Sequence, residues 1–339
     1  MNTLLNTVSF SGMTDLVRKT YLVNNQLVTS NAMQLFITDT IGAGQGDTKR
    51  YDEIDTETFA RNKAEGTDHK KARAGIGYNK TMTAKRYAMS IDITWEMRRF
   101  NRHAEAGSLV TDLSHFCPQR RELDLTHRLS FVSSTSYTDM DGDTVDTTGG
   151  DSLAIASTAH TLKFSATTWS NRVTGDPLFS RGALEAAESL GVSNILNNFG
   201  DRRVMNFNTI ITSDDPTTVN AVKQFLGSDS DGDQNNAGVM NVYKNKYRHV
   251  VLPWLATTAT GARDSTKRLW WFLAATGQGV KGWQAYYGEW EAPHMKDVPM
   301  DGKSNEDFAN DNWSYATRGT WGICVVTGRG LIASLPTSS

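Results

Sequence analysis

Apolar and polar residues alternate without a break between residues 85 and 95. Five large apolar side chains fall on one face of this segment: Tyr87, Met89, Ile91, Ile93 and Trp95. A period of two is typical of a β-strand with one buried face. The pattern therefore predicts a half-buried strand over residues 85–95.

The preceding stretch, residues 42–85, is polar along almost its whole length. Its large apolar residues are widely spaced: Tyr51, Ile54, Phe59, Ile76, Tyr78 and Met82. They are too few to form a core, so the stretch is either disordered or laid over another surface. Because it returns through a strong strand, we expect a two-armed loop, whose arms of about 20 residues would reach ~60 Å at about 3.3 Å per residue.

Between residues 96 and 132 the apolar positions recur every three or four residues, which predicts a long amphipathic helix. Pro118 lies inside this stretch and cannot donate to the helical hydrogen-bond ladder. We therefore expect the helix to bend at Pro118, or a second helix to begin there.

After residue 151 helices and strands are mixed. We predict a helix over 181–196 with Ser180 as its N-cap, and a second helix over 216–226 between the N-cap Asp215 and the terminating Gly227. Apolar runs predict strands over 204–212, 239–243, 247–252, 269–274, 284–290 and 313–326. Together with the earlier segments, these elements predict an α+β fold.

The chain has 339 residues, enough for about two domains. It carries 35 basic and 37 acidic side chains, and this near-neutral balance gives no bulk attraction for nucleic acid or anionic lipid. Basic residues are in excess over 49–128 and acidic ones over 129–339. These are either ordinary solvated faces or regions that meet across subunits.

Cys117 and Cys324 are the two cysteines, too few for a disulfide framework, and they indicate a reducing compartment. The N-terminus lacks the apolar core of a secretion signal. The longest apolar runs are far shorter than the roughly 18 residues of a membrane span. We therefore expect a protein that is neither secreted by a signal peptide nor inserted in a membrane.

Several apparent ligand motifs fail on spacing. The glycines of 42–46 and the sequence at 302–304 do not complete a phosphate-binding loop. The acidic clusters 139–143 and 229–233 resemble calcium loops, but Gln234 and Met240 stand where a calcium loop from Asp229 needs Gly and Glu. We interpret both clusters as turns, and we expect no cofactor.

No catalytic or metal site is expected either. Three histidines recur every 12 residues along the predicted helix, but this spacing places them on different faces: His103, His115 and His127. The nine tryptophans allow a carbohydrate or base-stacking platform, but strand and subunit packing is the commoner use of this residue.

The order of several segments resembles the major capsid proteins of tailed bacteriophages, the HK-ninety-seven type family. The segments that carry the resemblance are 157–160, 169–172, 178–190, 209–212, the helix at Pro216, 235–243, 250–253, 270–274 and 311–315 with Arg318 and Gly319. The similarity covers about residues 75 to 335. Thr161 stands where one branch of the family has Pro after the histidine.

The resemblance implies an α+β capsid fold with an N-terminal arm, an extended loop, a peripheral domain with a long spine helix, and an α/β axial domain. The implied boundaries are 1–41 for the arm, 42–95 for the extended loop, 96–164 for the peripheral domain, 165–300 for the axial domain, and 301–339 for C-terminal strands that return to the peripheral domain.

Two sets of site residues follow from the resemblance. An extended loop lying across an adjacent subunit would use Tyr51, Phe59, Lys63, Lys70, Lys71 and Arg73. A loop facing the capsomer axis would contain Asp229, Asp231, Asp233, Asn235 and Asn236.

The function that the resemblance implies is structural and not enzymatic: a head protein that self-assembles into an icosahedral shell around double-stranded DNA. Its partners would be copies of itself as pentamers and hexamers, weakly held packaged DNA, and portal, scaffold or decoration proteins, in a virion assembled in the bacterial cytoplasm. The alternatives are the shell of an encapsulin-like cellular nanocompartment, a tail or head-completion protein, and a carbohydrate-active enzyme or lectin that uses the tryptophans. Removing residues 46–80 is expected to leave a folded subunit that forms no shells.

Overall fold

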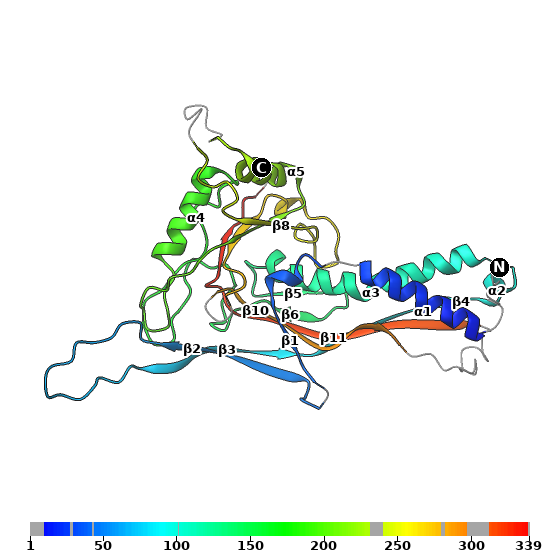
Figure 1. The fold of residues 1–339 in the computed structure, drawn as a ribbon, viewed down its shortest axis with the longest axis horizontal. Coiled ribbons are helices and arrows are strands. Elements are labelled where there is room, and N and C mark those ends of the chain that lie inside the picture. Colours follow the sequence, from blue (N-terminus) through cyan, green and yellow to red (C-terminus); the bar gives the residue numbers. More distant parts are fainter. Residues whose placement is uncertain are drawn as a thin grey trace.

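The computed structural model describes residues 10–27, 30–42, 44–100, 102–230, 240–278, 282–296 and 312–337. Figure 1 shows a long lower layer, a taller body above one end of it, and a hairpin that projects beyond that end.

The lower layer is a four-stranded sheet in the order β1-β10-β11-β4. Its strands are β1 (Ile37–Thr40), β10 (Gln284–Met295), β11 (Trp313–Thr327) and β4 (Lys85–Ile93). The long helix α3 (His103–Ser130) and the N-terminal helix α1 (Phe10–Leu27) lie above this sheet (Figure 1). Apolar residues of α1, α3, β4 and β11 pack together as one buried cluster.

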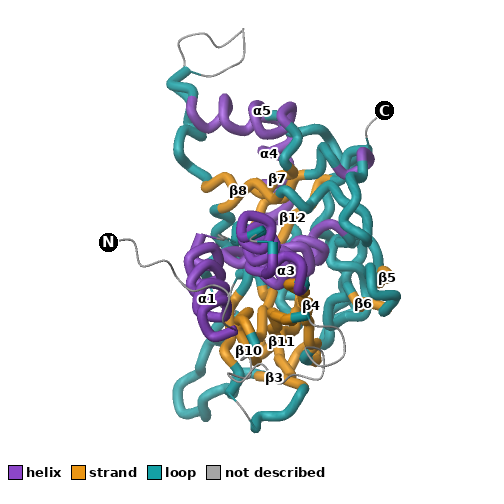
Figure 2. Tube along the Cα trace, turned by 90° about the vertical axis from the view of Figure 1, so that its right-hand side faces the viewer, coloured by secondary structure: helices purple, strands orange, loops and turns teal. Residues whose placement is uncertain are grey.

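The body contains a second sheet in the order β12-β9-β7-β8. Its strands are β12 (Leu331–Ser334), β9 (Trp271–Ala274), β7 (Thr209–Ser213) and β8 (Arg248–Leu252). Helices α4 (Arg181–Ser193) and α5 (Pro216–Gly227) pack on it through apolar side chains. Figure 2 shows α5 at the far end of the body from the lower sheet.

One apolar core joins the two layers. Leu125 and Leu129 of α3 meet Ile323 and Val325 of β11 and Phe272 of β9 in this core. Neither sheet therefore buries its apolar face independently of the other.

Two hairpins and several short helical segments complete the described fold. The hairpins are β2 (Thr48–Thr56) with β3 (Ala74–Thr83), and β5 (Ser136–Thr138) with β6 (Thr144–Asp146). The short helices are α2 (Trp95–Arg99) and the 3-10 turns Met33–Leu35 and Ser265–Lys267.

The predicted α+β class is confirmed, and so are the elements with strong local signals. The strand predicted over 85–95 is β4, which ends where Thr94 caps α2 by accepting a hydrogen bond from the Met97 amide. Ser180 caps α4 by accepting from the Ala183 amide. Asp215 caps α5 in the same way, accepting from the Thr217 amide.

Three predictions about elements were wrong in place or extent. The single helix predicted over 96–132 is two helices, α2 and α3, which separate near Phe100; α3 itself includes Pro118, and no second helix begins there. Strand β7 begins only at Thr209, and residues 240–243 form no strand. Met240 and Val242 are exposed there, so their apolar character does not mark a buried strand.

Among the described residues, no helix is both long enough and apolar enough to cross a membrane.

His127 is a buried titratable group on α3. Its side chain is 1% exposed, its Nε2 lies 3.1 Å from Thr257 Oγ1, and its ring packs edge-on against Phe131 and Tyr137. Burial, assisted by the nearby charge of Lys267, lowers the pKa of the imidazole from 6.5 to about 3.

This histidine should make the fold sensitive to acid. Between its folded pKa of about 3 and its ordinary value of 6.5, the unfolded chain binds more protons than the folded chain. The contribution is complete above pH 6.5 and is lost as the pH falls toward 3, by up to about 1.4 kcal/mol of unfolding free energy per pH unit. Urea unfolding at several pH values measures the unfolding free energy as a function of pH. Between pH 3 and 6.5 this free energy should fall less steeply for His127→Gln than for the wild type. The same pH dependence in both proteins would contradict the assignment.

Candidate functional site

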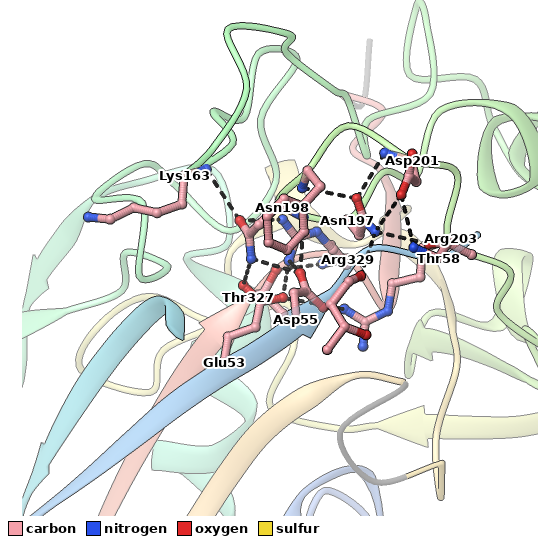
Figure 3. Close-up of polar contacts among 12 residues, drawn as sticks. Glu53, Asp55, Thr58, Lys163, Asn197, Asn198, Asp201, Arg203, Thr327 and Arg329 are labelled. Atoms are coloured by element: carbon pink, nitrogen blue, oxygen red, sulfur yellow. Dashed lines mark hydrogen bonds and ion pairs between the residues drawn. The ribbon is translucent and has the colours of Figure 1, made fainter. Parts of the chain in front are cut away.

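The hairpin β2–β3 is fixed to the body by a cluster of buried charged and amide side chains at its root (Figure 3). Glu53 and Asp55 on β2 meet Asn198 from the loop after α4, Arg203, and Arg329 from the turn between β11 and β12. Glu53 and Arg329 are each 1% exposed.

Arg329 is the central cation of this root cluster. Its Nη1 forms an ion pair with Glu53 Oε1 and lies 3.9 Å from Asp55 Oδ2. Its Nη2 donates to Asn198 Oδ1 over 3.1 Å. A buried charge is tolerated when it is paired and hydrogen-bonded in this way, and removing one partner leaves the other uncompensated.

Asn198 and Arg203 complete the root cluster. The side-chain amide of Asn198 donates to Glu53 Oε2 and Asp55 Oδ2, each over 2.8 Å, and its backbone amide donates to Asp55 Oδ2 over 3.0 Å. Arg203 Nη1 lies 3.3 Å from Glu53 Oε1 and 3.5 Å from Asp55 Oδ1. Burial lowers the pKa of Arg203, while the two carboxylates act in the opposite direction.

Two glycines on β3 allow this close approach. A Cβ at Gly77 would lie 2.3 Å from Asn198 Nδ2 and 3.1 Å from Glu53 Oε2. A Cβ at Gly75 would lie 2.7 Å from the ring of Phe164. Glycine inside a strand commonly marks such an approach by another segment.

Gly77→Ala should therefore weaken the root cluster. The added methyl must displace Asn198, and we expect a loss of about 1–3 kcal/mol of unfolding free energy. Hydrogen exchange across β3 should also become faster. Gly107→Ala is the matched control, because a Cβ there meets nothing within 4 Å and alanine favours a helix. A Gly77→Ala protein as stable as the control would contradict the steric role of Gly77.

The sequence segments 157–160 and 169–172 come together behind Arg329. His160 and Trp169 form a backbone bridge, with amide donations of 2.8 and 3.0 Å in the two directions, and their rings stack at 4.3 Å. The Arg329 guanidinium lies 5.5 Å from the Trp169 ring centroid. Asn171 Nδ2 donates over 3.1 Å to the carbonyl oxygen of Gly328. These two segments therefore support the turn that carries Arg329.

His160 also lies 2.6 Å, through Nδ1, from Asp151 Oδ2. A histidine–carboxylate pair can serve general acid–base catalysis. Here His160 is 1% exposed, and its Nε2 faces the Ile155 carbonyl and the Asn171 side-chain oxygen at 3.2 and 3.3 Å. The pair is enclosed by its own chain and acts as a structural tie.

The hairpin beyond its root is exposed. Phe59 is 71% exposed, and the loop residues Lys63, Lys70 and Lys71 are exposed as well. Arg73 returns toward the root, where its Nε donates to Glu57 Oε1 over 2.7 Å and its guanidinium lies 5.6 Å from the Phe199 ring centroid. Hydrogen bonds from Arg73 hold the pKa of Glu57 below its usual value.

Tyr51 differs from the other residues expected in this loop. It lies at the base of β2, stacks on Tyr286 at 4.1 Å, and donates from its hydroxyl to Asp39 Oδ2 over 2.6 Å. Burial raises the pKa of Tyr51, and the bond to Asp39 raises it further. Within one chain Tyr51 therefore joins β2 to β1 and β10.

Of the residues expected at the capsomer axis, Asp229 is described and exposed, and it pairs with Lys244. That ion pair lowers the pKa of Asp229. The other four expected residues lie outside the described part of the chain: Asp231, Asp233, Asn235 and Asn236.

The acidic cluster 139–143 is a turn, as predicted. Asp139 Oδ1 accepts from the backbone amides of Asp141 and Asp143, over 3.0 and 2.9 Å. Its Oδ2 contacts Lys85 and Arg120. Its oxygens are therefore occupied by the protein's own donors, and no group of metal-ligating side chains occurs in the described ranges.

Six of the nine tryptophans lie between residues 270 and 321, and most of these six are internal. Five are at most 8% exposed: Trp270, Trp271, Trp283, Trp313 and Trp321. Trp290 is partly buried and packs on the cluster around Met82. These six side chains therefore offer no open stacking platform.

No model of a protein family and no curated protein matches this sequence. Solved structures do match. The capsid of cyanophage P-SCSP1u matches with a TM-score of 0.52 and 10% identity, covering 89% of this chain and 86% of that one. The capsid of Ralstonia phage GP4 matches with a TM-score of 0.51 and 13% identity, covering 91% and 89%.

The chain has the fold of a phage capsid protein. The resemblance seen in the sequence is thereby confirmed at the level of the fold. A virus-like particle from Pyrococcus furiosus also matches, with a TM-score of 0.44, 12% identity, and coverage of 94% and 97%. At that TM-score it does not bear on the choice between kinds of shell.

In this capsid fold the projecting hairpin falls within the predicted extended loop, and sequence reasoning missed the cluster at its root. Glu53 and Arg329 are 276 positions apart, so no local pattern links them. The one sequence signal for this cluster was the pair Gly75 and Gly77 on either side of Ile76. Glycine within a strand often marks a place where another segment approaches the backbone closely.

Proposed function

We propose that this chain is a major capsid protein of a tailed phage, which self-assembles into an icosahedral shell enclosing double-stranded DNA. The single observation that carries the proposal is the capsid fold itself, matched over about nine-tenths of both chains at TM-scores of 0.51 and 0.52. Its role would be structural and not catalytic.

The exposed hairpin supports this proposal. The tip between β2 and β3 has no core of its own, and it is held out from the body by a buried anchor (Figures 1 and 3). Within one chain the exposed tip buries little surface and so adds little stability. In a shell the same tip would reach a neighbouring subunit. Many identical heterologous contacts are what a closed assembly requires.

The proposed division of the chain follows the family's arrangement. Residues 1–41 would be the N-terminal arm, 42–95 the extended loop, 96–164 the peripheral domain with α3 as its spine, 165–300 the axial domain, and 301–339 the returning strands. The loop after α5, which begins near Asp229, would face the axis of a pentamer or hexamer.

Weak contact with packaged DNA agrees with the overall charge. A chain with 35 basic and 37 acidic side chains does not grip a polyanion strongly. The expected location is the virion, after assembly in the host cytoplasm. Portal, scaffold and decoration proteins are the further partners we propose.

Size-exclusion chromatography with light scattering, followed by negative-stain electron microscopy of every peak, tests the proposal. We expect closed shells, or pentamers and hexamers. Particles recovered from infected or expressing cells should contain nuclease-protected DNA; a co-purifying cargo enzyme instead would indicate a cellular compartment. A chain that stays monomeric with and without candidate scaffold would refute the shell.

A further inference from the structure

The short β5–β6 hairpin carries charge of one sign. Residues 136–146 contain four aspartates and no lysine or arginine. Only Tyr137 and Asp139 are buried in this stretch, and Figure 2 shows the hairpin at one flank of the molecule. Like charges close together repel, and a two-stranded hairpin is marginally stable by itself. The hairpin therefore depends on cations from the surface that it covers.

Two of these cations come from the adjoining strands β3 and β4. Lys80 Nζ of β3 lies 2.6 Å from Asp146 Oδ2. Lys85 Nζ of β4 lies 2.7 Å from Asp143 Oδ2 and 2.8 Å from Asp139 Oδ2. Although burial opposes it, the hydrogen bond from Lys85 helps to hold the pKa of Asp139 below its usual value.

Two further cations come from helix α3. Arg120 Nη2 lies 3.0 Å from Asp141 Oδ2 and 3.1 Å from Asp139 Oδ2, and Arg120 also pairs with Asp124 of its own helix. Arg128 Nη1 donates to a backbone carbonyl oxygen of the hairpin. Four cations from three elements thus face the four aspartates of one hairpin.

The contact between the hairpin and these elements is polar. A cavity of about 450 Å³ lies between them, with Lys80, Lys85 and Arg128 on one side and Asp143 and Asp146 on the other. Among the described residues, the buried apolar clusters include none from this hairpin. Ion pairs with exposed partners are individually weak, so charge holds the hairpin in place without fixing it in the core.

The charges here are segregated, unlike those of ordinary surface pairs. Arg181 and Glu185, for example, lie on the same helix and cannot be separated by a movement of one element. Around the cavity the cations are on one side and the hairpin aspartates on the other. If the hairpin moved away, Lys80, Lys85 and Arg128 would lose their partners on it together.

We propose that the β5–β6 hairpin is an acidic flap that masks a basic site formed by Lys80, Lys85, Arg120 and Arg128, and so prevents this site from binding the phosphates of nucleic acid. The flap carboxylates stand where phosphates would bind, because both groups present anionic oxygens to lysine and arginine. The choice of DNA as the excluded polyanion rests on the proposed function. Masking gives the weak hold on packaged DNA a local cause.

The first test neutralises the flap with Asp141→Asn/Asp143→Asn/Asp146→Asn. These three side chains are exposed, and asparagine keeps their shape, so the variant should fold. Binding of the unassembled chain to a short DNA duplex is measured by fluorescence anisotropy at several salt concentrations. We expect the variant to bind at least about tenfold more tightly than the wild type, with a steeper salt dependence, because more phosphates are neutralised.

The matched control neutralises three paired acids elsewhere, with Glu185→Gln/Glu188→Gln/Asp229→Asn. It changes the net charge by the same amount, so it measures the effect of bulk charge alone. Adding Lys80→Gln/Lys85→Gln to the flap variant should restore weak binding. A flap variant that binds duplex no more tightly than the control would overturn the inference.

A second test uses the wild-type chain and needs no variant to fold. Lysines are acetylated with an N-hydroxysuccinimide ester, and mass spectrometry compares Lys80 and Lys85 with the exposed Lys70 and Lys71. Raising NaCl from about 0.1 M to about 1 M shortens the Debye length from about 10 Å to about 3 Å and should raise the relative reactivity of Lys80 and Lys85 at least about threefold. Unchanged relative reactivity would show that the hairpin does not detach, and would also overturn the inference.

These outcomes separate the two proposals. If the wild-type chain forms no shells, the proposed function fails, while both tests of the flap can still be read on the unassembled chain. If shells with nuclease-protected DNA form but the flap variant behaves like the control, the capsid function stands and the masking is wrong.

Discussion

Replacing Arg329 by methionine will lower the unfolding free energy by about 3–5 kcal/mol. This is a large part of the total unfolding free energy of a typical folded protein, which is about 5–15 kcal/mol. The change leaves Glu53 buried without its main cation, and it removes the donor to Asn198 Oδ1. Methionine replaces only the aliphatic stem of arginine, so the loss combines a carboxylate pair left with Arg203 as its one cation and the space that the buried guanidinium occupied. Chemical unfolding followed by tryptophan fluorescence measures it.

An exposed ion pair provides the matched control. Arg181 Nε lies 2.9 Å from Glu185 Oε1 on the surface of α4, and both side chains are more than one-third exposed. Arg181→Met should cost about 0.3–0.5 kcal/mol or less. Combining Arg329→Met with Glu53→Gln should recover part of the loss, because no charge is then stranded. If Arg329→Met costs no more than Arg181→Met, the root cluster does not anchor the hairpin.

Shortening the hairpin tip will abolish shell formation while leaving the fold intact. The change replaces residues 58–72 by Asn-Gly, which closes a two-residue turn between Glu57 and Arg73. It removes Phe59 and the three exposed lysines but leaves the root cluster and both strands of the hairpin in place. The melting temperature should stay within about 2 °C, since almost no buried surface is lost.

Light scattering and electron microscopy of the shortened chain give the answer. A tip of the original length made of Gly and Ser is the control for reach alone; we expect it to yield fewer shells than the wild type, since Phe59 and the lysines are absent. If the shortened chain forms shells as well as the wild-type chain does, the tip takes no part in assembly.

The structure revises what removing the whole of residues 46–80 should do. From the sequence, that deletion is expected to leave a folded subunit. It would in fact also remove Glu53 and Asp55 and leave Arg329 and Arg203 buried without their carboxylates. We therefore expect the larger deletion to destabilise the body, which is why the tip replacement is confined to residues 58–72.

Local signals were sufficient for some elements. The alternation that predicts β4 and the caps Ser180 and Asp215 all depend on residues within a few positions of one another. The helix through Pro118 shows the limit of such signals. Proline removes one helical hydrogen bond, but the neighbouring Leu113 and Cys117 are buried, and this packing outweighs the local loss.

The sequence by itself predicted an α+β fold and a long polar excursion that returns through a half-buried strand, and the order of its segments resembled that of capsid proteins. Only the tertiary structure decided which face of the excursion is buried. In β2 the charged Glu53 and Asp55 point inward and the apolar Ile54 points outward, the reverse of what alternation alone suggests. The physical reason is that Arg329 and Arg203, distant in sequence, neutralise the carboxylates where the chain folds back.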